Sequence, residues 1–495
     1  MAISNPGGLL NAVPATVQQA FSTNYLDFTN GTNAWSQQYL PDLMEKEAEV
    51  FGKRTISGFL SQVGAEEAMQ SDQVIWSEQG RLHLTYTCTI KTAASNLVTI
   101  TDHVDTNAAY ASGSHGIRKG DTVIIANSTK SVTIKGYVSA IDVSGDVNDI
   151  TVAPYNSNDL ADTRIGMADS DAAVIMVYGS EYKKGDNYNG SENHTANEPS
   201  FKSYSNKPII MKDFYQVSGS DTSRIGWVEV TGEAGQSGYL WYLKAEGDTR
   251  SRFTDYIEMA MIEGVLGTND NVVDTALAND SSNPASSVGT EGLFAAIESR
   301  GNITTGVTGV NAATDLAEFD AILAEFDRQG AIEENMMFTN RATALAIDDM
   351  LASMNSYGAG GTSYGVFNNS EDMALNLGFS GFRRGSYDFY KSDWKYLNDK
   401  GTRGSINDFD KVNAIRGVMI PAGVSSVYDE MLGKNLKRPF LHVRYRASQT
   451  DNRRFKTWVT GSVGAATTSL DAMNVHFLSE RCLITQGANN FMLMK

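Results

Sequence analysis

Cysteine and proline are both scarce in this chain of 495 residues. Its two cysteines, Cys88 and Cys482, lie far apart, so they supply neither a disulfide framework nor the paired thiolates of a zinc site. The nine prolines fall well below the usual ~5% of residues, and with 9% aromatic residues this composition argues against a collagen-like or disordered chain. The sequence therefore predicts a folded protein that assembles in a reducing compartment.

Positively charged residues are also few. Lysine and arginine number 40 against 58 acidic residues, which gives a net charge of −18. Proteins whose main task is nucleic-acid binding usually carry a basic excess that neutralises phosphates, so this balance argues against that task. Charged residues make up only 20% of the chain, below the usual ~25%, so small polar or apolar residues occupy more of the surface. Such a surface suits large protein–protein contacts.

Long hydrophobic runs are missing as well. No segment approaches the ~18 consecutive apolar residues of a membrane span. Residues 1–14 lack a basic opening and are interrupted by Pro6 and Pro14, unlike a secretory signal. The sequence predicts no membrane partner.

Patterns for catalysis or metal binding are nearly absent. The six histidines are scattered without the helical spacing of a zinc site, so no metal and no cofactor are expected. Asp142, Asp146 and Asp149 miss the spacing of a calcium-binding loop, which favours a solvated β-turn. Residues 361–365 match the Gly-x-Ser-x-Gly pattern, but no apolar strand precedes Ser363, which favours a surface loop over a serine esterase. No catalytic residue is predicted.

Residues 1–50 are polar and lack sustained periodicity, yet aromatic residues are interspersed among them. A disordered tail and an extended arm both fit this composition. Ordering a segment costs about 1–2 kcal/mol per residue, so an ordered arm must bury its aromatic side chains to offset that cost. We interpret the segment as an arm that docks on another subunit through Phe21, Tyr25, Phe28 and Trp35.

The strongest strand signal lies at 81–91, where apolar and polar residues alternate. We expect its antiparallel partner at 209–217, which makes a long hairpin with an insert between its arms. The insert, 93–182, contains short β-branched runs separated by glycine and aspartate clusters, a pattern typical of a small β-barrel or sandwich. Its expected strands are 97–100, 122–125, 132–138, 150–152 and 173–177.

Helical periodicity follows the hairpin, and strands return towards the C-terminus. Phe253, Ile257, Met261 and Val265 form one stripe of the first helix, and Gly247 marks a possible break in it. The expected helices are 238–266, 291–299, 315–329 and 340–354. The expected strands are 386–390, 416–420, 441–446 and 455–459, with one or two more in 476–493.

Basic residues crowd one short region of this acidic chain: Lys434, Lys437, Arg438, Arg444, Arg446, Arg453, Arg454 and Lys456. In a strand over 441–446, His442, Arg444 and Arg446 would share one face. A solvated face and an inter-subunit surface that meets acidic neighbours fit this pattern equally, and nucleic-acid contact is a third alternative.

The order of these elements resembles one family, the major capsid proteins of tailed bacteriophages with the Hong Kong 97-like fold. The run from Trp76 to His83, followed by a barrel-like insert, is most similar to the crAss-like phages. The resemblance implies an α+β fold with an N-terminal arm, an extended β-hairpin loop, an inserted β-domain, a peripheral domain with a spine helix, and an axial domain. The arm is implied at 1–55, the extended loop at 56–92 with 183–232, and the inserted β-domain at 93–182. The peripheral domain is implied at 233–333 with 464–495, and the axial domain at 334–463.

The resemblance also implies a function. Such a chain self-assembles through hexamers and pentamers into the icosahedral shell around the double-stranded DNA genome, in the cytoplasm of the bacterial host. Portal, scaffolding and auxiliary capsid proteins are the implied partners, and the packaged DNA lies against the inner face without sequence-specific contacts. The expected inter-subunit residues are the four aromatic residues of the arm together with Trp76, Arg81, Arg444, Arg446, Arg453 and Arg454.

Two features depart from the minimal family pattern, namely the insert itself and the lack of a charged helical segment before the arm. The second departure implies a separate scaffolding protein or a segment that has been removed. No lysine–asparagine pair matches the covalent cross-link of some members. The alternative is another virion structural protein, such as a tail or adhesin component, although the sequence has no internal repeat to support a fibre.

Overall fold

The computed structural model forms two compact units, Ile75–Ser205 and the remainder, Met1–Val74 with Asn206–Lys495. The residues that it describes are 65–79, 83–103, 115–127, 132–143, 146–162, 166–185, 201–222, 229–231, 237–267, 272–277, 288–329, 332–355, 380–407, 414–422, 424–429, 434–462 and 467–495.

The smaller unit contains a closed barrel of six strands, arranged in the order β3-β4-β7-β6-β5-β8. Its strands are β3 (Thr85–Thr92), β4 (Leu97–His103), β5 (Asp121–Asn127), β6 (Thr133–Val143), β7 (Asp146–Pro154) and β8 (Ala172–Ser180), with a short 3-10 helix, η3 (Ala93–Ser95). Alternate residues point inward and pack into one apolar core that includes Ile90, Val98, Ile125, Ile150 and Ile175. The prediction of a small β-barrel is therefore confirmed, and all five expected strands of the insert are present.

The arms that flank the barrel differ from the prediction. Strand β2 (Val74–Gln79) pairs with β9 (Phe201–Asn206). The alternating segment 81–91 instead supplies β3, which closes the barrel by pairing with β4 and β8. Pairing of 81–91 with 209–217 is therefore wrong, because the barrel core takes the inward side chains Tyr86, Cys88 and Ile90.

The larger unit contains a five-stranded sheet in the order β1-β20-β22-β10, in which β21 also pairs with β22. The strands are β1 (Ala65–Met69), β10 (Ile209–Ser218), β20 (Leu441–Arg446), β21 (Lys456–Gly461) and β22 (Ala472–Thr485). The expected strand at 209–217 thus exists as β10, and its antiparallel partner is β22, which runs from Ile209 opposite Arg481 to Ser218 opposite Ala472.

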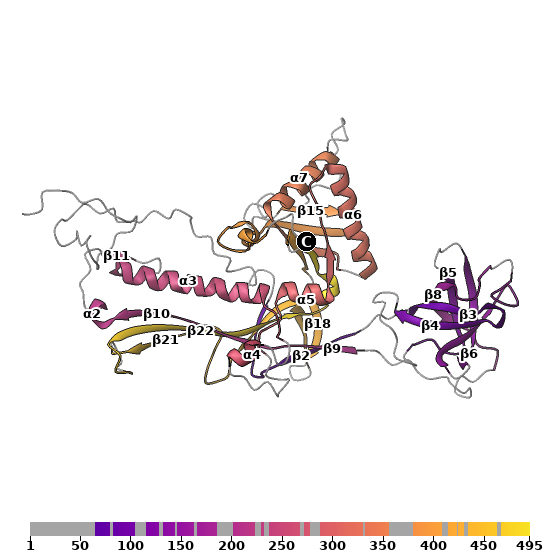
Figure 1. Ribbon diagram of the computed structural model, residues 1–495, viewed down its shortest axis with the longest axis horizontal. Coiled ribbons are helices and arrows are strands. Elements are labelled where there is room, and N and C mark those ends of the chain that lie inside the picture. The colour runs from indigo at the N-terminus through magenta and orange to yellow at the C-terminus, as the bar shows by residue number, and fades with distance from the viewer. Residues whose placement is uncertain are drawn as a thin grey trace, which may run out of the picture. The chain divides into compact units, whose positions relative to one another are not determined.

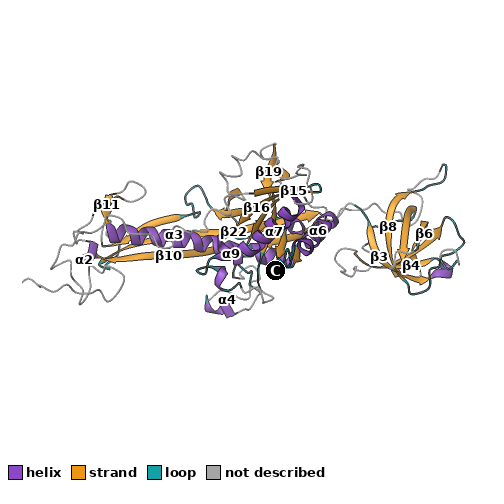
Figure 2. Ribbon diagram, turned by 90° about the horizontal axis from the view of Figure 1, so that it is seen from above, coloured by secondary structure: helices purple, strands orange, loops and turns teal. Residues whose placement is uncertain are grey.

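Helix α3 (Leu240–Glu263) lies along β10 and β22 of this sheet, as Figure 1 and Figure 2 both show. The stripe predicted from helical spacing makes the contact, since Phe253 and Ile257 pack with Val475 and Phe477 of β22. Gly247 does not break the helix, and Val265 lies beyond the last turn, where 69% of it is exposed.

A second, six-stranded sheet has the order β13-β23-β17-β14-β16-β15. Its strands are β13 (Asn302–Thr304), β14 (Glu334–Thr339), β15 (Ser380–Arg384), β16 (Tyr387–Asp393), β17 (Gly417–Pro421) and β23 (Met492–Met494). Helices α6 (Ala312–Gln329) and α7 (Arg341–Asn355) pack on it through Phe319, Ile322, Phe326 and Ile347.

The remaining elements are α2 (Gly219–Thr222), β11 (Glu229–Thr231), β12 (Ser237–Tyr239), α4 (Val272–Ala276), α5 (Leu293–Arg300), α9 (Lys395–Asn398), β18 (Val424–Asp429), β19 (Lys434–Pro439), and the 3-10 helices η5 (Arg403–Ser405) and η6 (Ala488–Asn490).

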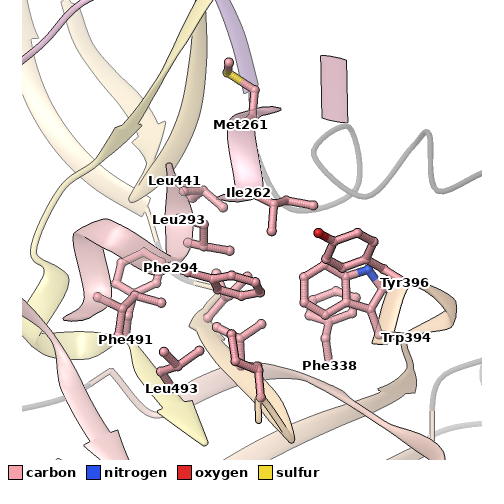
Figure 3. Packing of buried hydrophobic residues seen from close by; sticks show 14 of the residues in the cluster. Met261, Ile262, Leu293, Phe294, Phe338, Trp394, Tyr396, Leu441, Phe491 and Leu493 are labelled. Atoms are coloured by element: carbon pink, nitrogen blue, oxygen red, sulfur yellow. The ribbon is translucent and has the colours of Figure 1, made fainter. Parts of the chain in front are cut away.

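One apolar core joins the two sheets of the larger unit. It combines Met261 and Ile262 at the end of α3 with Leu293 and Phe294 of α5 (Figure 3). From one sheet it takes Leu441, Val443 and Leu483, and from the other Phe338, Val418, Ile420 and Leu493. The end of α3 is therefore anchored where the two sheets meet.

The contacts group the elements differently from the expected segments. Helix α6 packs with α7 on the six-stranded sheet, whereas the expected division placed 315–329 beside the long helix. Strands β20 and β21 join the sheet under α3, whereas 441–446 and 455–459 were expected in the axial segment. The barrel begins with β3, ahead of the expected boundary at residue 93.

Both cysteines are buried and free. Burial raises the pKa of Cys88 to about 12 and, against the opposing effect of Arg444, that of Cys482 to about 12. Both thiols therefore stay protonated at neutral pH and act as small apolar side chains.

Candidate assembly surface

Five of the basic residues singled out from the sequence belong to the five-stranded sheet or to the turn between β20 and β21: Arg444, Arg446, Arg453, Arg454 and Lys456. The other three, Lys434, Lys437 and Arg438, lie on β19, which pairs with β18 in a separate sheet. Strand alternation sorts the side chains of the five-stranded sheet onto its two faces. We call the face that packs on α3 the helix face and the opposite one the distal face. Leu441, Val443 and Leu483 point into the core below α3 and α5, on the helix face. Because successive side chains alternate, Arg444, Arg446 and Glu480 lie on the distal face.

Acidic residues of β1 and the turn after it pair with these arginines. In the parallel register Glu67 lies opposite Arg444, and their charged groups are 3.0 Å apart. Arg446 pairs with Glu480 at 2.6 Å and also with Asp72. On the helix face Glu66 pairs with Arg481 at 3.4 Å and with Arg454. These pairs tie β1 to a strand more than 370 positions later in the chain.

Glu480 is the centre of this network. Only 4% of it is exposed, and its carboxylate pairs with Arg446 and, at 2.8 Å, with Arg453. Burial alone would lower the pKa of Arg446, but hydrogen bonds to Asp72 and Glu480 raise it above its ordinary value. Burial lowers the pKa of Arg481, which lies deeper. A guanidinium remains charged across the physiological range, so the arginines of the network keep their positive charge.

The four arginines proposed for inter-subunit contact thus have acidic partners within their own chain. Arg444, Arg446, Arg453 and Arg454 all take part in the network described above. His442 does not share a solvated face with them, since it is 1% exposed and its Nδ1 lies 3.3 Å from the carbonyl of Pro439. Sequence analysis expected no strand at 65–69, and the adjacent acids Glu66 and Glu67 are the signal that could have identified the partner.

Most of the other expected inter-subunit residues lie outside the described residues: Phe21, Tyr25, Phe28, Trp35 and Arg81, as does Ser363. Trp76 is described, and it is 7% exposed. Its ring lies 6.2 Å from that of Tyr204, and its Nε1 donates a hydrogen bond to Glu78. Trp76 of β2 therefore packs beside Tyr204 of the paired strand β9 in its own chain.

An aromatic row that sequence analysis missed crosses the distal face. Phe214, His476 and Trp458 occupy matching positions on β10, β22 and β21. The rings of Trp458 and His476 stack at 5.1 Å, and Phe214 lies 6.2 Å from His476. Phe214 is 58% exposed and its neighbour Ile210 is 53% exposed. The register of three distant strands creates this row, so no local pattern revealed it.

A shallow hollow of about 240 Å³ borders the row. It is lined by Asp451, Arg453, Lys456, Trp458 and Leu478. Lys456 donates a hydrogen bond to Asp451 and lowers the pKa of that carboxyl, so the rim is charged at neutral pH. An apolar floor beside a charged rim is the usual composition of a protein–protein contact.

The described residues contain no group of three side chains suited to a metal ion, and no described helix is long and apolar enough to cross a membrane. Asp149 corrects one expectation, because it is fully buried rather than solvated. It pairs with Lys91 and accepts a hydrogen bond from Thr99. This aspartate is therefore a structural residue of the barrel.

No family model matches this chain, and no curated protein matches it. Similar solved structures include capsids of phages and of a GTA particle. The capsid structure of cyanophage P-SCSP1u is 9% identical over 94% of this chain and 95% of its own, with a TM-score of 0.38. The mature capsid asymmetric unit of bacteriophage PhiM1 is 8% identical over 99% and 98%, with a TM-score of 0.39. The capsid of a native GTA particle is 10% identical over 94% and 98%, with a TM-score of 0.37. These scores are too low to carry an argument about this chain.

We expect Glu480→Gln to lower the free energy of unfolding of the larger unit by roughly 2–3 kcal/mol, because two partly buried guanidiniums lose their shared counter-charge. Urea denaturation followed by intrinsic fluorescence measures this loss. The matched control is Asp72→Asn, since the Asp72 side chain is 91% exposed and its pair with Arg446 should contribute at most about 1 kcal/mol. Equal effects of the two substitutions would contradict a central role for Glu480.

Proposed function

We propose that this chain is the major capsid protein of a tailed bacteriophage, with the Hong Kong 97-like fold and most similar to the crAss-like phages. Copies self-assemble through hexamers and pentamers into an icosahedral shell that encloses double-stranded DNA. The protein resides in the virion capsid after assembly in the cytoplasm of the bacterial host. Portal, scaffolding and auxiliary capsid proteins are its further partners.

The observation that carries the proposal is the long two-layer element of α3 on β10, β21 and β22. Helix α3 covers the helix face through Phe253 and Ile257. The distal face presents Phe214 and Ile210, each more than half exposed, beside the stacked pair of Trp458 and His476. A sheet face with exposed apolar side chains can bury them against a neighbouring subunit, and heterologous contacts of this kind close into rings.

The parts of the family fold are assigned on this basis. We assign the N-terminal arm to residues 1–55, which lie outside the described residues. The extended loop, expected at 56–92 with 183–232, is assigned to the part that contains β2 and β9, which flank the inserted barrel. Helix α3 and its five-stranded sheet form the peripheral domain. The six-stranded sheet with α6 and α7 forms the axial domain. We propose these groups from the packing contacts, beside the division expected from the sequence into 233–333 with 464–495 and 334–463.

The charge of the chain supports a shell that encloses DNA without binding it tightly. The net charge of −18 repels phosphates, and the arginines most suited to phosphate binding are neutralised by Glu66, Glu67 and Glu480. Contacts with packaged DNA are consequently weak and independent of base sequence.

Negative-stain electron microscopy of the purified full-length chain tests the proposal, and the expected result is hollow shells or capsomers. The double substitution Ile210→Ser/Phe214→Ser should leave the melting temperature within about 2–4 °C of wild type, since both residues are exposed, but should reduce the assembled fraction at least ~tenfold. The matched control is Gln216→Ser, at an exposed position on the same face of β10. A wild-type chain that remains monomeric at all concentrations and salt conditions, with its proposed scaffolding protein supplied, would overturn the proposal.

A further inference from the structure

Partly exposed aromatic side chains gather on the outer wall of the barrel. Tyr155 and Tyr178 are each 48% exposed, Tyr182 is 42% exposed and Met176 is 39% exposed. Tyr137 completes the group, which we call the tyrosine patch. Together with Ile75 on β2, the most exposed large apolar side chains in the described part of the smaller unit are Tyr155, Met176, Tyr178 and Tyr182.

Strand register brings the patch together. On β5 and β6, Thr122 lies opposite Tyr137, and on β5 and β8 it lies opposite Gly179, next to Tyr178. The backbone N–H of Tyr155 donates to the carbonyl of Lys135, two residues before Tyr137. Tyr182 packs over Gly120, where an added Cβ would meet its ring at 3.2 Å. Four segments of the barrel thus place their aromatic side chains on one wall.

The patch is anchored from within. Val138, next to Tyr137, and Ile175, next to Met176, point inward and are fully buried in the barrel core. The hydroxyl of Tyr155 donates a hydrogen bond to Glu181, which raises the pKa of Tyr155 to about 12. The phenol is therefore neutral at physiological pH, and the ring is held in place before any partner arrives. Rigid rings of this kind lose little conformational entropy on binding.

Lysines border the patch. Lys135 lies on the wall itself, Lys119 precedes Gly120, and Lys183 and Lys184 follow Tyr182. None of the four forms an ion pair with another described residue of the structure, and Lys135, Lys183 and Lys184 are exposed. A rim of this charge favours an acidic partner, and a chain with a net charge of −18 is itself such a partner.

We propose that the tyrosine patch docks on an acidic surface of a neighbouring copy of this chain, an inference that rests on the proposed shell function. The patch offers roughly 300–500 Å², less than the ~800 Å² per partner of a standard stable interface. A single contact is therefore too weak to hold two free chains together. In a closed shell the contact recurs in every subunit, and multivalency makes a weak contact effective. Tyrosine, enriched at the centre of protein interfaces, suits this role.

The test compares full-length variants with wild type under assembly conditions, by sucrose-gradient sedimentation and electron microscopy. Tyr155→Ser/Tyr178→Ser should raise the chain concentration needed for half-assembly at least ~tenfold, which corresponds to ~1.4 kcal/mol. Tyr155→Phe keeps the ring and should assemble like wild type. The charge variant Lys183→Glu/Lys184→Glu should weaken assembly and reduce its dependence on salt, whereas Lys395→Glu/Lys400→Glu, at exposed positions on the larger unit, is the matched control.

The outcomes separate this inference from the proposed function. If wild type forms no shells, the proposed function fails and this inference fails with it. If wild type assembles and the tyrosine and lysine variants assemble equally well, only the docking of the patch is overturned. The same holds if the variants assemble normally but lose binding to a glycan or to a different protein. If the tyrosine variant does not fold, the exposed lysine variant still decides the question.

Discussion

Phe253→Ala is expected to lower the free energy of unfolding of the larger unit by about 3–5 kcal/mol, because it removes the central ring of a small core. Phe253 is 1% exposed, and its ring lies 5.6 Å from that of Phe455 and 6.0 Å from that of Phe477. Among the described residues, this cluster between α3 and the sheet has four buried members, Phe253, Ile257, Val475 and Phe477, and Phe455 is a partly buried neighbour. A cavity there leaves the middle of α3 with little to hold it against β22.

Urea denaturation of the full-length chain measures this effect, and the barrel provides an internal reference because it has a separate core. The matched control is Tyr256→Ala on the same helix, where the side chain is 48% exposed and the expected change is within about 0.5 kcal/mol. Similar losses for Phe253 and Tyr256 would show that α3 is not held by the cluster. Phe253→Ala should also reduce shell assembly, since the distal face is positioned by the sheet that α3 supports.

Deletion of residues 1–40 is expected to leave a folded chain. The chain concentration needed for half-assembly should rise about a hundredfold or more. The described core clusters draw on residues from position 84 onward, so they do not require the arm. Each aromatic side chain of the arm that is buried on a neighbour should contribute about 1.5–3 kcal/mol before ordering costs. We therefore expect a larger combined contribution to the free energy of assembly from Phe21, Tyr25, Phe28 and Trp35 than from any single rim contact.

Circular dichroism and thermal melting check the fold of the truncated chain, and sedimentation measures its assembly. A full-length variant with all four aromatic residues replaced by serine separates the effect of the rings from that of chain length, and it should reproduce the defect. Unfolding of the truncated chain would instead assign the arm to the core of its own subunit. Normal assembly of the truncated chain would show that the arm is a solvated tail.

The basic region shows where sequence reasoning reaches its limit. Alternation correctly placed Arg444 and Arg446 on one face of a strand at 441–446, which the structure has as β20. Their partners Glu67 and Asp72 are more than 370 positions away, and only the parallel pairing of β1 with β20 brings them close. A cluster of one sign in a sequence therefore does not predict a charged surface, because the opposite charges can come from any strand that the sheet recruits.

The barrel shows the same limit for pairing. Its strands were predictable, because β-branched runs between glycine and aspartate turns have a local period. Strand 81–91 was also correct as a strand, but its own residues do not distinguish β8 from β10 as its partner, since both segments are of suitable length and carry alternating apolar side chains. The pairing of this strand with β8 is determined by the burial of Tyr86, Cys88 and Ile90 inside the closed barrel.

By itself, the sequence determined most of the elements and their class. The stripe of Phe253, Ile257 and Met261, the helix at α6 and the strands of the barrel follow from periodicity, which depends only on how side chains repeat along a helix or strand. Tertiary structure alone decided which strands pair, that α6 packs on the six-stranded sheet, and that two aromatic surfaces form on the distal face and the barrel wall. The physical reason is that pairing and packing depend on register between segments far apart in the chain, and hydrophobic burial is non-directional, so many partners satisfy any one segment until the whole core closes.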